Sequence, residues 1–580
     1  MTPELAHLLV VPVVLPLLAA ALLLWIGDGR RRFRSLLQIG LTGAELLVAL
    51  EILRRVDGDG LGTIGVYLAA NWEAPFGIVL VADRLTALLL VLTGVVGVAA
   101  ATYASASWSR AGVYFHPLLQ IQLMGLNGVF LTGDLFNLFV FFEVMLAASY
   151  GLLLHGSGWP RVKAGLHYLA VNLLASSLFL VGLALLYGVT GTLSMADLAA
   201  KLPGVPAADR GPLHAGMALL AVAFLTKAAM WPLGFWLVPA YRAASAPAAA
   251  LFAIMTKVGV YAVLRLSTLI LSEAAGPSAG FGAPVLLYGG LATCAFGTLG
   301  LLASLHLGQI AGFSIVVSAG TLLAAVAVGG AAVTSSALFY LLSATLAGSA
   351  LFLLVELVER REARASSAPP PDPDPELDPD EDTNLDDAEE PIVGRAIPVS
   401  LALLGLAYIA CALLVAGLPP LSGFVAKVAL LSALAGAAGL GGSEPPATDA
   451  PVAAIGALFA LLLLSGLAAT LALTRTGIRH LWVSADRLPP RLTVAEGLPV
   501  LVLLAACIGL TVRAEPVLRY TSATAEALHA PAAYIEAVLG TQRVHRRAHA
   551  DGIPSAPVPP DPLRRDRGAA PPLAAAEAAR

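Results

Sequence analysis

Four charged residues lie deep inside apolar segments of the sequence: Glu143, Lys227, Lys257 and Lys427. Near the middle of a bilayer an ionised side chain costs about 2.5 to 3.5 kcal/mol on insertion scales, so such a residue needs a partner, water or a function. A static ion pair between Glu143 and one lysine could simply fix helix packing. That interpretation accounts for two of the four residues and leaves the other two lysines charged without partners.

A set of buried lysines can carry protons. Burial disfavours the charged form of a lysine, whereas a nearby carboxylate favours it. A lysine that gains and then loses such a partner therefore binds and releases a proton. We predict that the four residues translocate protons, and we expect no metal site and no bound cofactor. We also expect no nucleotide or nucleic acid partner, because the sequence has no Walker A motif or dinucleotide-binding glycine pattern in a suitable context.

Prolines next to two of these lysines predict helix breaks at membrane depth. Pro232 follows Lys227, and Pro419 and Pro420 precede Lys427. A proline inside a helix removes one backbone hydrogen bond and clashes with the carbonyl group four residues earlier. Backbone groups freed in this way are tolerated in a membrane only where they face protein or water. We therefore expect both lysines to adjoin hydrated cavities.

The composition places these residues in a membrane protein. Of the 580 residues, 58% are hydrophobic and only 12% are charged, whereas a soluble domain is about 25% charged. This excludes a soluble globular enzyme. The formal net charge is −4, and removing the eleven acidic residues between positions 372 and 390 leaves the rest of the chain at +7. A mildly basic remainder is typical of membrane proteins with cationic cytoplasmic loops.

Fourteen apolar stretches of spanning length follow one another. We predict an all-α integral membrane protein with about 14 transmembrane helices, at residues 7–27, 35–53, 84–106, 111–132, 134–155, 163–190, 213–242, 245–271, 283–304, 308–329, 334–358, 396–438, 451–474 and 494–513. The seventh and twelfth stretches are too long for one simple span and contain the prolines described above. Lys227 and Lys427 are five spans apart, and a repeat with an odd number of spans must reverse its direction across the membrane. This spacing predicts two inverted five-helix repeats, each with a broken helix.

The predicted organisation has five parts. Residues 1–110 hold helices 1–3, residues 111–271 the first repeat with helices 4–8, residues 283–474 the second repeat with helices 9–13, and residues 494–513 helix 14. Residues 359–395 are acidic and proline-rich, so we predict a disordered loop there. Residues 514–580 form an extramembrane tail that we expect to be largely flexible. Lys and Arg are concentrated after the odd-numbered spans, which places those loops, including 359–395, in the cytoplasm.

Three segments resemble the antiporter-like family that is shared by multisubunit Mrp-type Na⁺/H⁺ antiporters and the proton-pumping subunits of respiratory complex I. They are residues 132–143, 227–261 and 417–427, and the similarity extends over about residues 80–513. The first segment and residues 530–535 are most similar to the D subunits of the Mrp type. The resemblance implies one subunit of a large hetero-oligomer in the bacterial cell (inner) membrane. It also implies that this complex exchanges protons for Na⁺ or another monovalent cation.

The resemblance assigns a role to each buried charge. Glu143 and Lys227 are implied to form a modulating ion pair. Lys257 is implied to be a central relay, and Lys427 the terminal proton-exchange site.

This chain departs from the family between Lys257 and Lys427. No acidic residue, basic residue or histidine lies between His306 and Glu356, so side chains alone do not form a continuous relay. We hypothesise that water bridges the gap, held by the hydroxyl groups of Ser314, Ser318, Tyr340, Ser343 and Thr345. The alternative is that these small residues serve only helix packing.

Two other functions agree with the same sequence. A proton-pumping subunit of an NADH:quinone oxidoreductase or hydrogenase would use the same channel and take its energy from redox chemistry elsewhere. A scaffold would use its buried ions only to dock partner subunits, and Lys427→Ala would then leave transport intact. Our prediction is a subunit of a cation/proton antiporter, which is a secondary transporter rather than an enzyme.

Overall fold

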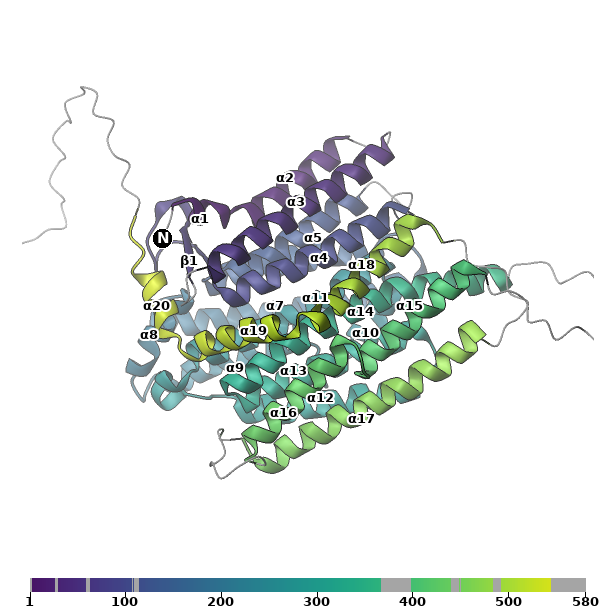
Figure 1. Ribbon diagram of the computed structural model, residues 1–580. Coiled ribbons are helices and arrows are strands. Elements are labelled where there is room, and N and C mark those ends of the chain that lie inside the picture. The colour runs from purple at the N-terminus through teal and green to yellow at the C-terminus, as the bar shows by residue number, and fades with distance from the viewer. Residues whose placement is uncertain are drawn as a thin grey trace, which may run out of the picture. The chain divides into compact units, whose positions relative to one another are not determined.

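The computed structural model is built almost entirely of helices that lie alongside one another (Figure 1). The structure describes residues 3–26, 30–58, 63–106, 108, 114–366, 398–439, 448, 450–482 and 492–543. The helices of the first half are α1 (Pro3–Leu8), α2 (Val11–Ile26), α3 (Arg31–Asp57), α4 (Arg84–Ala106), α5 (Phe115–Leu131), α6 (Leu135–Leu154), α7 (Trp159–Thr190), α8 (Met195–Lys201), α9 (Arg210–Lys227), α10 (Leu237–Ala243) and α11 (Ala246–Arg265). Those of the second half are α12 (Ala283–Ala303), α13 (Leu307–Val328), α14 (Ala331–Ser366), α15 (Val399–Ala416), α16 (Ser422–Ala437), α17 (Val452–Gly477), α18 (Val494–Val512), α19 (Ala514–His529) and α20 (Ala532–Leu539).

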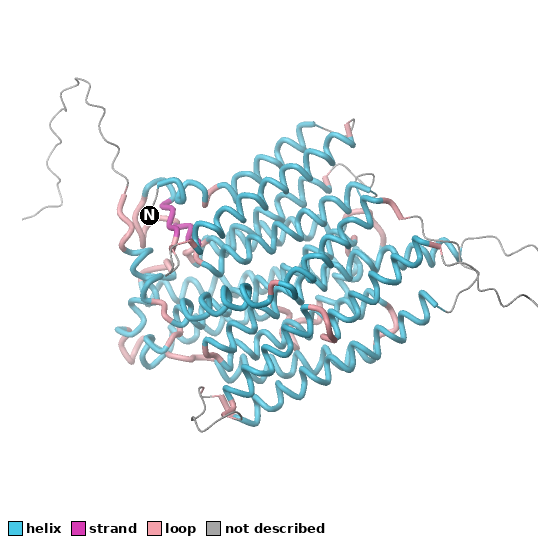
Figure 2. The backbone as a smooth tube through the Cα atoms, viewed as in Figure 1, coloured by secondary structure: helices cyan, strands magenta, loops and turns pink. Residues whose placement is uncertain are grey.

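A small hairpin lies near the N-terminal end of the chain (Figure 2). Its strands β1 (Gly65–Leu68) and β2 (Val79–Ala82) are antiparallel, with Gly65 opposite Ala82. Short tighter or wider helical turns complete the secondary structure at Ala69–Asn71, Leu202–Gly204, Leu266–Ile270, Glu273–Ser278 and Ile478–Trp482.

The predicted all-α membrane fold is confirmed. Within the described residues, twelve helices are long and apolar enough to cross a membrane. The two remaining predicted spans correspond to α5 and to the broken pair α9 and α10. The predicted twelfth span is likewise broken, into α15 and α16. The described residues up to position 542 pack as one unit, and the boundaries of the two inverted repeats stay a prediction.

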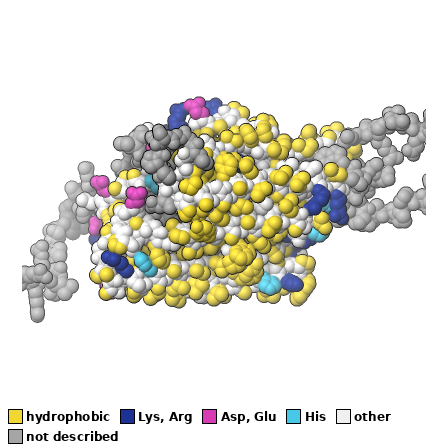
Figure 3. Space-filling model, turned by 90° about the horizontal axis from the view of Figure 1, so that it is seen from below, with side chains coloured by type: hydrophobic (Ala, Val, Ile, Leu, Met, Phe, Trp, Pro, Cys, Tyr) yellow, Lys and Arg dark blue, Asp and Glu magenta, His cyan; other side chains and the backbone are white. Residues whose placement is uncertain are grey.

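The outer helices expose large apolar side chains. Leu36 and Leu47 of α3 are 69% and 68% exposed, and Leu299 of α12 is 66% exposed. On the face shown in Figure 3, hydrophobic side chains cover the middle, and charged side chains gather toward the two ends. In water such a surface would drive aggregation, whereas lipid tails are as apolar as these side chains. The outer surface of the described helices is therefore suited to contact with lipid.

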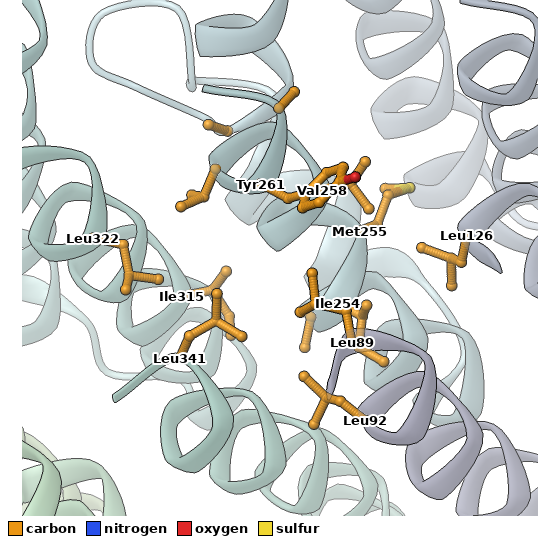
Figure 4. Close-up of a cluster of buried hydrophobic side chains, with 14 of the residues drawn as sticks. Leu89, Leu92, Leu126, Ile254, Met255, Val258, Tyr261, Ile315, Leu322 and Leu341 are labelled. Carbon is orange, nitrogen blue, oxygen red and sulfur yellow. The ribbon is translucent and has the colours of Figure 1, made fainter. Parts of the chain in front are cut away.

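Helix α11 occupies the centre of the packed helices. Every residue of this helix is buried, and Figure 4 shows Ile254 and Val258 of α11 within a cluster that also holds Leu89 of α4, Ile315 of α13 and Leu341 of α14. The side chains that Figure 4 labels on these helices are apolar apart from one tyrosine hydroxyl and one thioether. Apolar side chains therefore pack around this part of α11.

The predicted loop at 359–395 was wrong over its first eight residues, because α14 continues to Ser366. Residues 359–366 are rich in Glu, Arg and Ala, which favour helix. Arg360 also pairs with Glu356 one turn earlier, at 2.5 Å, and with Glu496 of α18. Residues 367–395 lie outside the described part of the chain.

The predicted flexible tail was wrong over residues 514–539, which form α19 and α20. Helix α19 is amphipathic, and its buried face carries Thr521, Thr524, Ala525 and Leu528. Thr521 Oγ1 lies 3.1 Å from Ser335 Oγ of α14, so this face packs on the transmembrane helices. A face of this kind, with period 3.6, orders a segment by packing. Residues 544–580 lie outside the described residues.

Candidate functional site

Glu143 lies in the third turn of α6 and is half-buried. The helix is fixed at its start by Asp134, whose carboxylate accepts a hydrogen bond of 2.9 Å from the backbone N–H of Asn137. The carboxylate of Glu143 accepts a hydrogen bond from the hydroxyl of Ser176 on α7. Within the described residues, no Lys or Arg nitrogen lies within 4.0 Å of it.

Lys227 is the last residue of α9 and is buried. Its ammonium nitrogen lies 4.9 Å from the centre of the Phe142 ring, an arrangement in which the aromatic face attracts the cation. Phe142 directly precedes Glu143 in α6. Within the described residues Glu143 and Lys227 make no direct contact, because the carboxylate binds Ser176 and the ammonium faces Phe142. The implied modulating ion pair therefore stays a prediction.

The break after Lys227 is confirmed, and two backbone groups at the break are bonded to side chains. Residues 228–236, which include Pro232, separate α9 from α10. The indole N–H of Trp236 donates to the carbonyl of Thr226 at 3.2 Å, and the backbone N–H of Trp231 donates to the hydroxyl of Thr293 at 2.9 Å. A small cavity adjoins Lys227 and is lined in part by Trp236 and Tyr168.

Lys257 lies in the middle of α11 and is fully buried. Its ammonium group donates a hydrogen bond of 2.6 Å to the hydroxyl of Ser318 on α13. Its neighbours one turn away and one residue away, Ile254 and Val258, belong to the apolar cluster of Figure 4. The positive charge of Lys257 is therefore stabilised by the hydroxyl group of Ser318 and by any water bound to that hydroxyl.

Lys427 lies in the second turn of α16, after the break that contains Pro419 and Pro420. Its ammonium group donates a hydrogen bond of 2.8 Å to the carbonyl of Ala416, the last residue of α15. The lysine therefore binds one of the backbone carbonyls that the end of a helix leaves without an amide partner.

Two glycines make room for the Lys427 side chain. Gly417 has a left-handed backbone with φ of 76°, and a Cβ there would lie 2.5 Å from Lys427 Cδ. A Cβ on Gly466 of α17 would lie 3.1 Å from the lysine nitrogen and 2.8 Å from the carbonyl oxygen of Ala416. Any side chain at either position would displace the lysine or the break.

A cavity connects the partner of Lys257 with Lys427. It is lined by Ser318 and Lys427, together with Ser314, Tyr340 and Ser343. Its volume is about 40 Å³, and roughly 10–15 Å³ measured in this way is enough for one water. Four of the five hydroxyl residues expected to hold water thus line one space between the two lysines.

Thr345 does not belong to this cavity. Its hydroxyl donates to the carbonyl of Leu341 in its own helix, at 2.6 Å. This bond is the ordinary way in which a threonine inside a helix satisfies its hydroxyl. The expected role of Thr345 in a hydrated path is therefore not supported by its position.

Two ion-pair clusters near the ends of helices were not predicted from the sequence. Arg265 of α11 makes two hydrogen bonds to Asp83, at 2.5 and 2.9 Å. Glu356 of α14 binds Arg360 and also accepts hydrogen bonds from the indole of Trp108 and from the backbone N–H of Ala246. The sequence holds a signal for both clusters. Arg265 is a charged residue inside the predicted span 245–271, where it needs a partner, and Glu356 precedes Arg360 by four residues, a spacing that pairs opposite charges on a helix.

A family model described as "NADH:quinone oxidoreductase/Mrp antiporter, TM" matches residues 132–440, which include the break at 228–236 and all four buried charges. The D subunit of a probable K⁺/H⁺ antiporter from Rhizobium meliloti (strain 1021) is 51% identical over 549 residues, covering 94% of this chain and 99% of the relative. The D subunit of an Na⁺/H⁺ antiporter from Bacillus subtilis (strain 168) is 31% identical, covering 92% of this chain and 99% of the relative.

A solved structure of an Mrp complex is also similar to this chain. A chain of the Mrp complex from Dietzia sp. DQ12-45-1b superposes with a TM-score of 0.74 at 27% identity, covering 93% of this chain and all of that one. The resemblance inferred from residues 132–143, 227–261 and 417–427, including the similarity to D subunits, is confirmed by these relatives. The chain therefore belongs to the NADH:quinone oxidoreductase/Mrp antiporter family.

Proposed function

We propose that this chain is a membrane subunit of a multisubunit monovalent cation/proton antiporter, and that it moves the protons. The observation that carries the proposal is the connection from Lys257 through Ser318 and the 40 Å³ cavity to Lys427. The ammonium form of one lysine can pass a proton through Ser318 and water in this cavity to the neutral amine form of the other lysine, whereas two lysines without a polar connection cannot exchange a proton.

The proposed sequence of events uses the four buried charges in spatial order. Glu143 acts on Lys227 through its charge rather than through direct contact, so a change in the ionisation of Glu143 alters how strongly Lys227 holds its proton. A proton released along this row reaches Lys257, passes through the cavity and arrives at Lys427. There the carbonyl of Ala416 holds the ammonium form in place.

The relatives support a proposal for the exchanged cation and for the partners. The names of the two relatives assign K⁺/H⁺ exchange to one and Na⁺/H⁺ exchange to the other, and the one named for K⁺ is 51% identical. We propose that the complex exchanges K⁺ or Na⁺ for protons in a bacterial cell membrane, together with the other antiporter subunits. The acidic segment at 359–395 then lies on the cytoplasmic side.

The test is cation-dependent proton flux in inverted vesicles from a host without its own antiporters, expressing the whole complex without an electron donor. K⁺ and Na⁺ are added separately. We expect flux from the unaltered complex and less than a tenth of it from Lys257→Met and Lys427→Ala. The matched control is Lys201→Ala, because Lys201 lies on α8, has a side chain that is 45% exposed, and pairs with Asp197 one turn earlier.

Three other results would contradict the proposal. Flux that appears only with an electron donor would assign the chain to a redox-driven pump. Normal flux from fully assembled Lys257→Met and Lys427→Ala complexes would leave the buried charges as docking structure. Equal losses in Lys201→Ala and Lys427→Ala would show that the effect is not specific to the buried row. Co-purification of the other subunits with each variant measures assembly.

A further inference from the structure

A second polar row crosses half of the predicted membrane thickness, away from the lysines. Arg34, Gln38, Thr42 and Glu45 recur every three or four residues along α3, so they share one face of the helix. All four are buried, and Gln38, Thr42 and Glu45 are at most 4% exposed. Helix α3 is one of the twelve spans, and Glu45 lies near its middle.

Helices α4 and α5 complete this row. Gln120 of α5 donates a hydrogen bond of 2.9 Å to the hydroxyl of Thr42, and His116 lies one turn before Gln120 on the same face of α5. Gly97 of α4 has no side chain at this level, and a Cβ there would lie 3.2 Å from the methyl group of Thr42. In Figure 1 these helices lie together on the side of the molecule opposite α16 and α17.

Several of these buried polar groups have no partner in the protein. Within the described chain, both amide atoms of Gln38, both ring nitrogens of His116, the Oε1 atom of Glu45 and the Oε1 atom of Gln120 make no hydrogen bond. Buried polar groups in proteins are almost always hydrogen-bonded, to protein or to ordered water. Four such residues in one row, nine-tenths or more buried, form a path of groups that bind water.

The polar residues of the row extend to the N-terminal end of α3 and not to its C-terminal end. It begins at Arg34, in the turn that follows the basic residues Arg30 to Arg32, which indicate the cytoplasmic side. Beyond Glu45 the same face of α3 carries Ala49, Ile52 and Val56, which are buried and apolar. Water that enters along the row therefore stops at the carboxyl group of Glu45.

The second row is separate from the lysines. Helix α5 directs Gln120 toward α3, whereas the amide nitrogen of Gln122 lies 3.8 Å from the sulfur of Met255 on α11. Residues two positions apart along a helix point to nearly opposite faces. Helix α5 thus stands between the second row and the cavity beside Lys227, which Met255 lines.

We propose that this second row is a cytoplasmic half-channel for protons that ends at Glu45. Water held by Gln38, Thr42, His116 and Gln120 connects the aqueous phase with the carboxyl group of Glu45, which binds and releases the proton. The site goes beyond the proposed function of the lysine row, and only its transport readout depends on that function. The ligand is the hydrated proton, because Glu45 and His116 are titratable within the row.

The first experiment measures water access and needs no transport. The three cysteines Cys294, Cys411 and Cys507 are first replaced by serine, and single cysteines are then placed at Gln38→Cys and at Ile52→Cys in the whole complex. Ile52 is the matched control, since it lies on the same face of α3 and is fully buried. Ag⁺, an ion small enough to follow water, is added to inverted vesicles, which expose the cytoplasmic side.

We expect Ag⁺ to block Gln38→Cys at least tenfold faster than Ile52→Cys, with unblocked thiols counted by alkylation after denaturation. Equal rates at the two positions would overturn the proposal, because the row would then be dry.

The second experiment measures flux in the complex that retains its cysteines. Glu45→Gln has nearly the same shape and cannot release a proton, so we expect at least a tenfold loss of cation-dependent proton flux, with substantial recovery in Glu45→Asp. Unchanged flux in an assembled Glu45→Gln complex would overturn the proposal, whatever the Ag⁺ result. Lys427→Ala is measured in parallel, because a loss there with none in Glu45→Gln refutes the second row alone, and no loss in either refutes the lysine row as well.

Discussion

Replacing Gly466 by alanine tests whether the position of Lys427 against the break matters for transport. The added methyl group would lie 2.8 Å from the carbonyl oxygen of Ala416 and 3.1 Å from the nitrogen of Lys427. The carbonyl belongs to the backbone and cannot rotate away. Either α17 moves from the break, or the hydrogen bond of 2.8 Å between Lys427 and Ala416 is lost.

The size of the effect follows from that bond. A hydrogen bond made by a charged group contributes about 1.5–3 kcal/mol, and each ~1.4 kcal/mol is a factor of ten. If the ammonium form of Lys427 at this position is required in each transport cycle, Gly466→Ala should lower cation-dependent proton flux roughly ten- to hundredfold. The assay is the inverted-vesicle flux described above, with assembly measured by co-purification.

The same helix provides the control. Gly456 also lies in α17, and a Cβ there would meet no atom within 4 Å. Gly456→Ala makes the same chemical change and should leave flux unaltered. Full flux from an assembled Gly466→Ala complex would refute the reasoning, because it would show that Lys427 works equally well without the carbonyl of Ala416.

Three further predictions concern contacts at other places. Ser318→Ala removes the side-chain partner of Lys257 and should slow proton flux several-fold. Thr345→Val, which removes a hydroxyl that bonds the carbonyl of Leu341 in its own helix and does not line the cavity, should change flux little; equal effects would contradict the assignment. Phe142→Leu removes the aromatic ring that faces the ammonium group of Lys227, an interaction of up to about 2 kcal/mol when desolvated. Proton flux is measured for Phe142→Leu, for Glu143→Gln and for the double variant, and we expect the two effects on flux not to be additive. Asp83→Asn leaves the guanidinium of Arg265 buried without its partner, which costs about 3–5 kcal/mol and should lower the thermal unfolding midpoint of the purified complex. Burial raises the pKa of Asp83, but the charge and hydrogen bonds of Arg265 outweigh it and hold that pKa below its usual value. The ion pair therefore stabilises the protein above about pH 4 and is lost on further acidification, so the difference between Asp83→Asn and the unaltered protein should shrink below that pH.

The spans, the helix breaks and the four buried charges could be predicted because their signals are local. A run of apolar residues is long enough to cross a bilayer or it is not, and Pro232, Pro419 and Pro420 interrupt helices wherever the helices pack. The predicted all-α membrane fold depended only on these features. The hydroxyl residues around the cavity could also be predicted, since the gap between His306 and Glu356 in titratable residues is visible in the sequence.

Contacts between helices could not be predicted in the same way. Glu143 and Lys227 are both surrounded by apolar residues in the sequence, so nothing local shows which neighbour each side chain faces. In the structure Glu143 faces Ser176, and Lys227 faces the ring of Phe142. Thr345 was included for its hydroxyl group, and the sequence does not reveal that this hydroxyl bonds its own helix.

Two features were missed although the sequence contains a signal for them. The polar residues from Arg34 to Glu45 repeat with the period of a helix, whereas the prediction relied on charges at the centre of a span rather than on polar residues along one face. Residues 514–529 have an apolar face in an otherwise polar segment, which favours a packed helix over a flexible tail. In both cases the spacing of polar and apolar residues along the helix was informative, and the overall composition of the segment was not.

The bonds at the two ends of α11 have a mechanical consequence. The carboxylate of Glu356 accepts a hydrogen bond from the first backbone N–H of α11, at Ala246. The bidentate contact with Asp83 binds Arg265, the last residue of α11. A helix that is hydrogen-bonded at both ends and buried along its whole length resists sliding and tilting. Displacement of the Lys257 charge is therefore expected to come from its own flexible four-carbon side chain, and the proposed proton transfer through Lys257 requires no movement of α11.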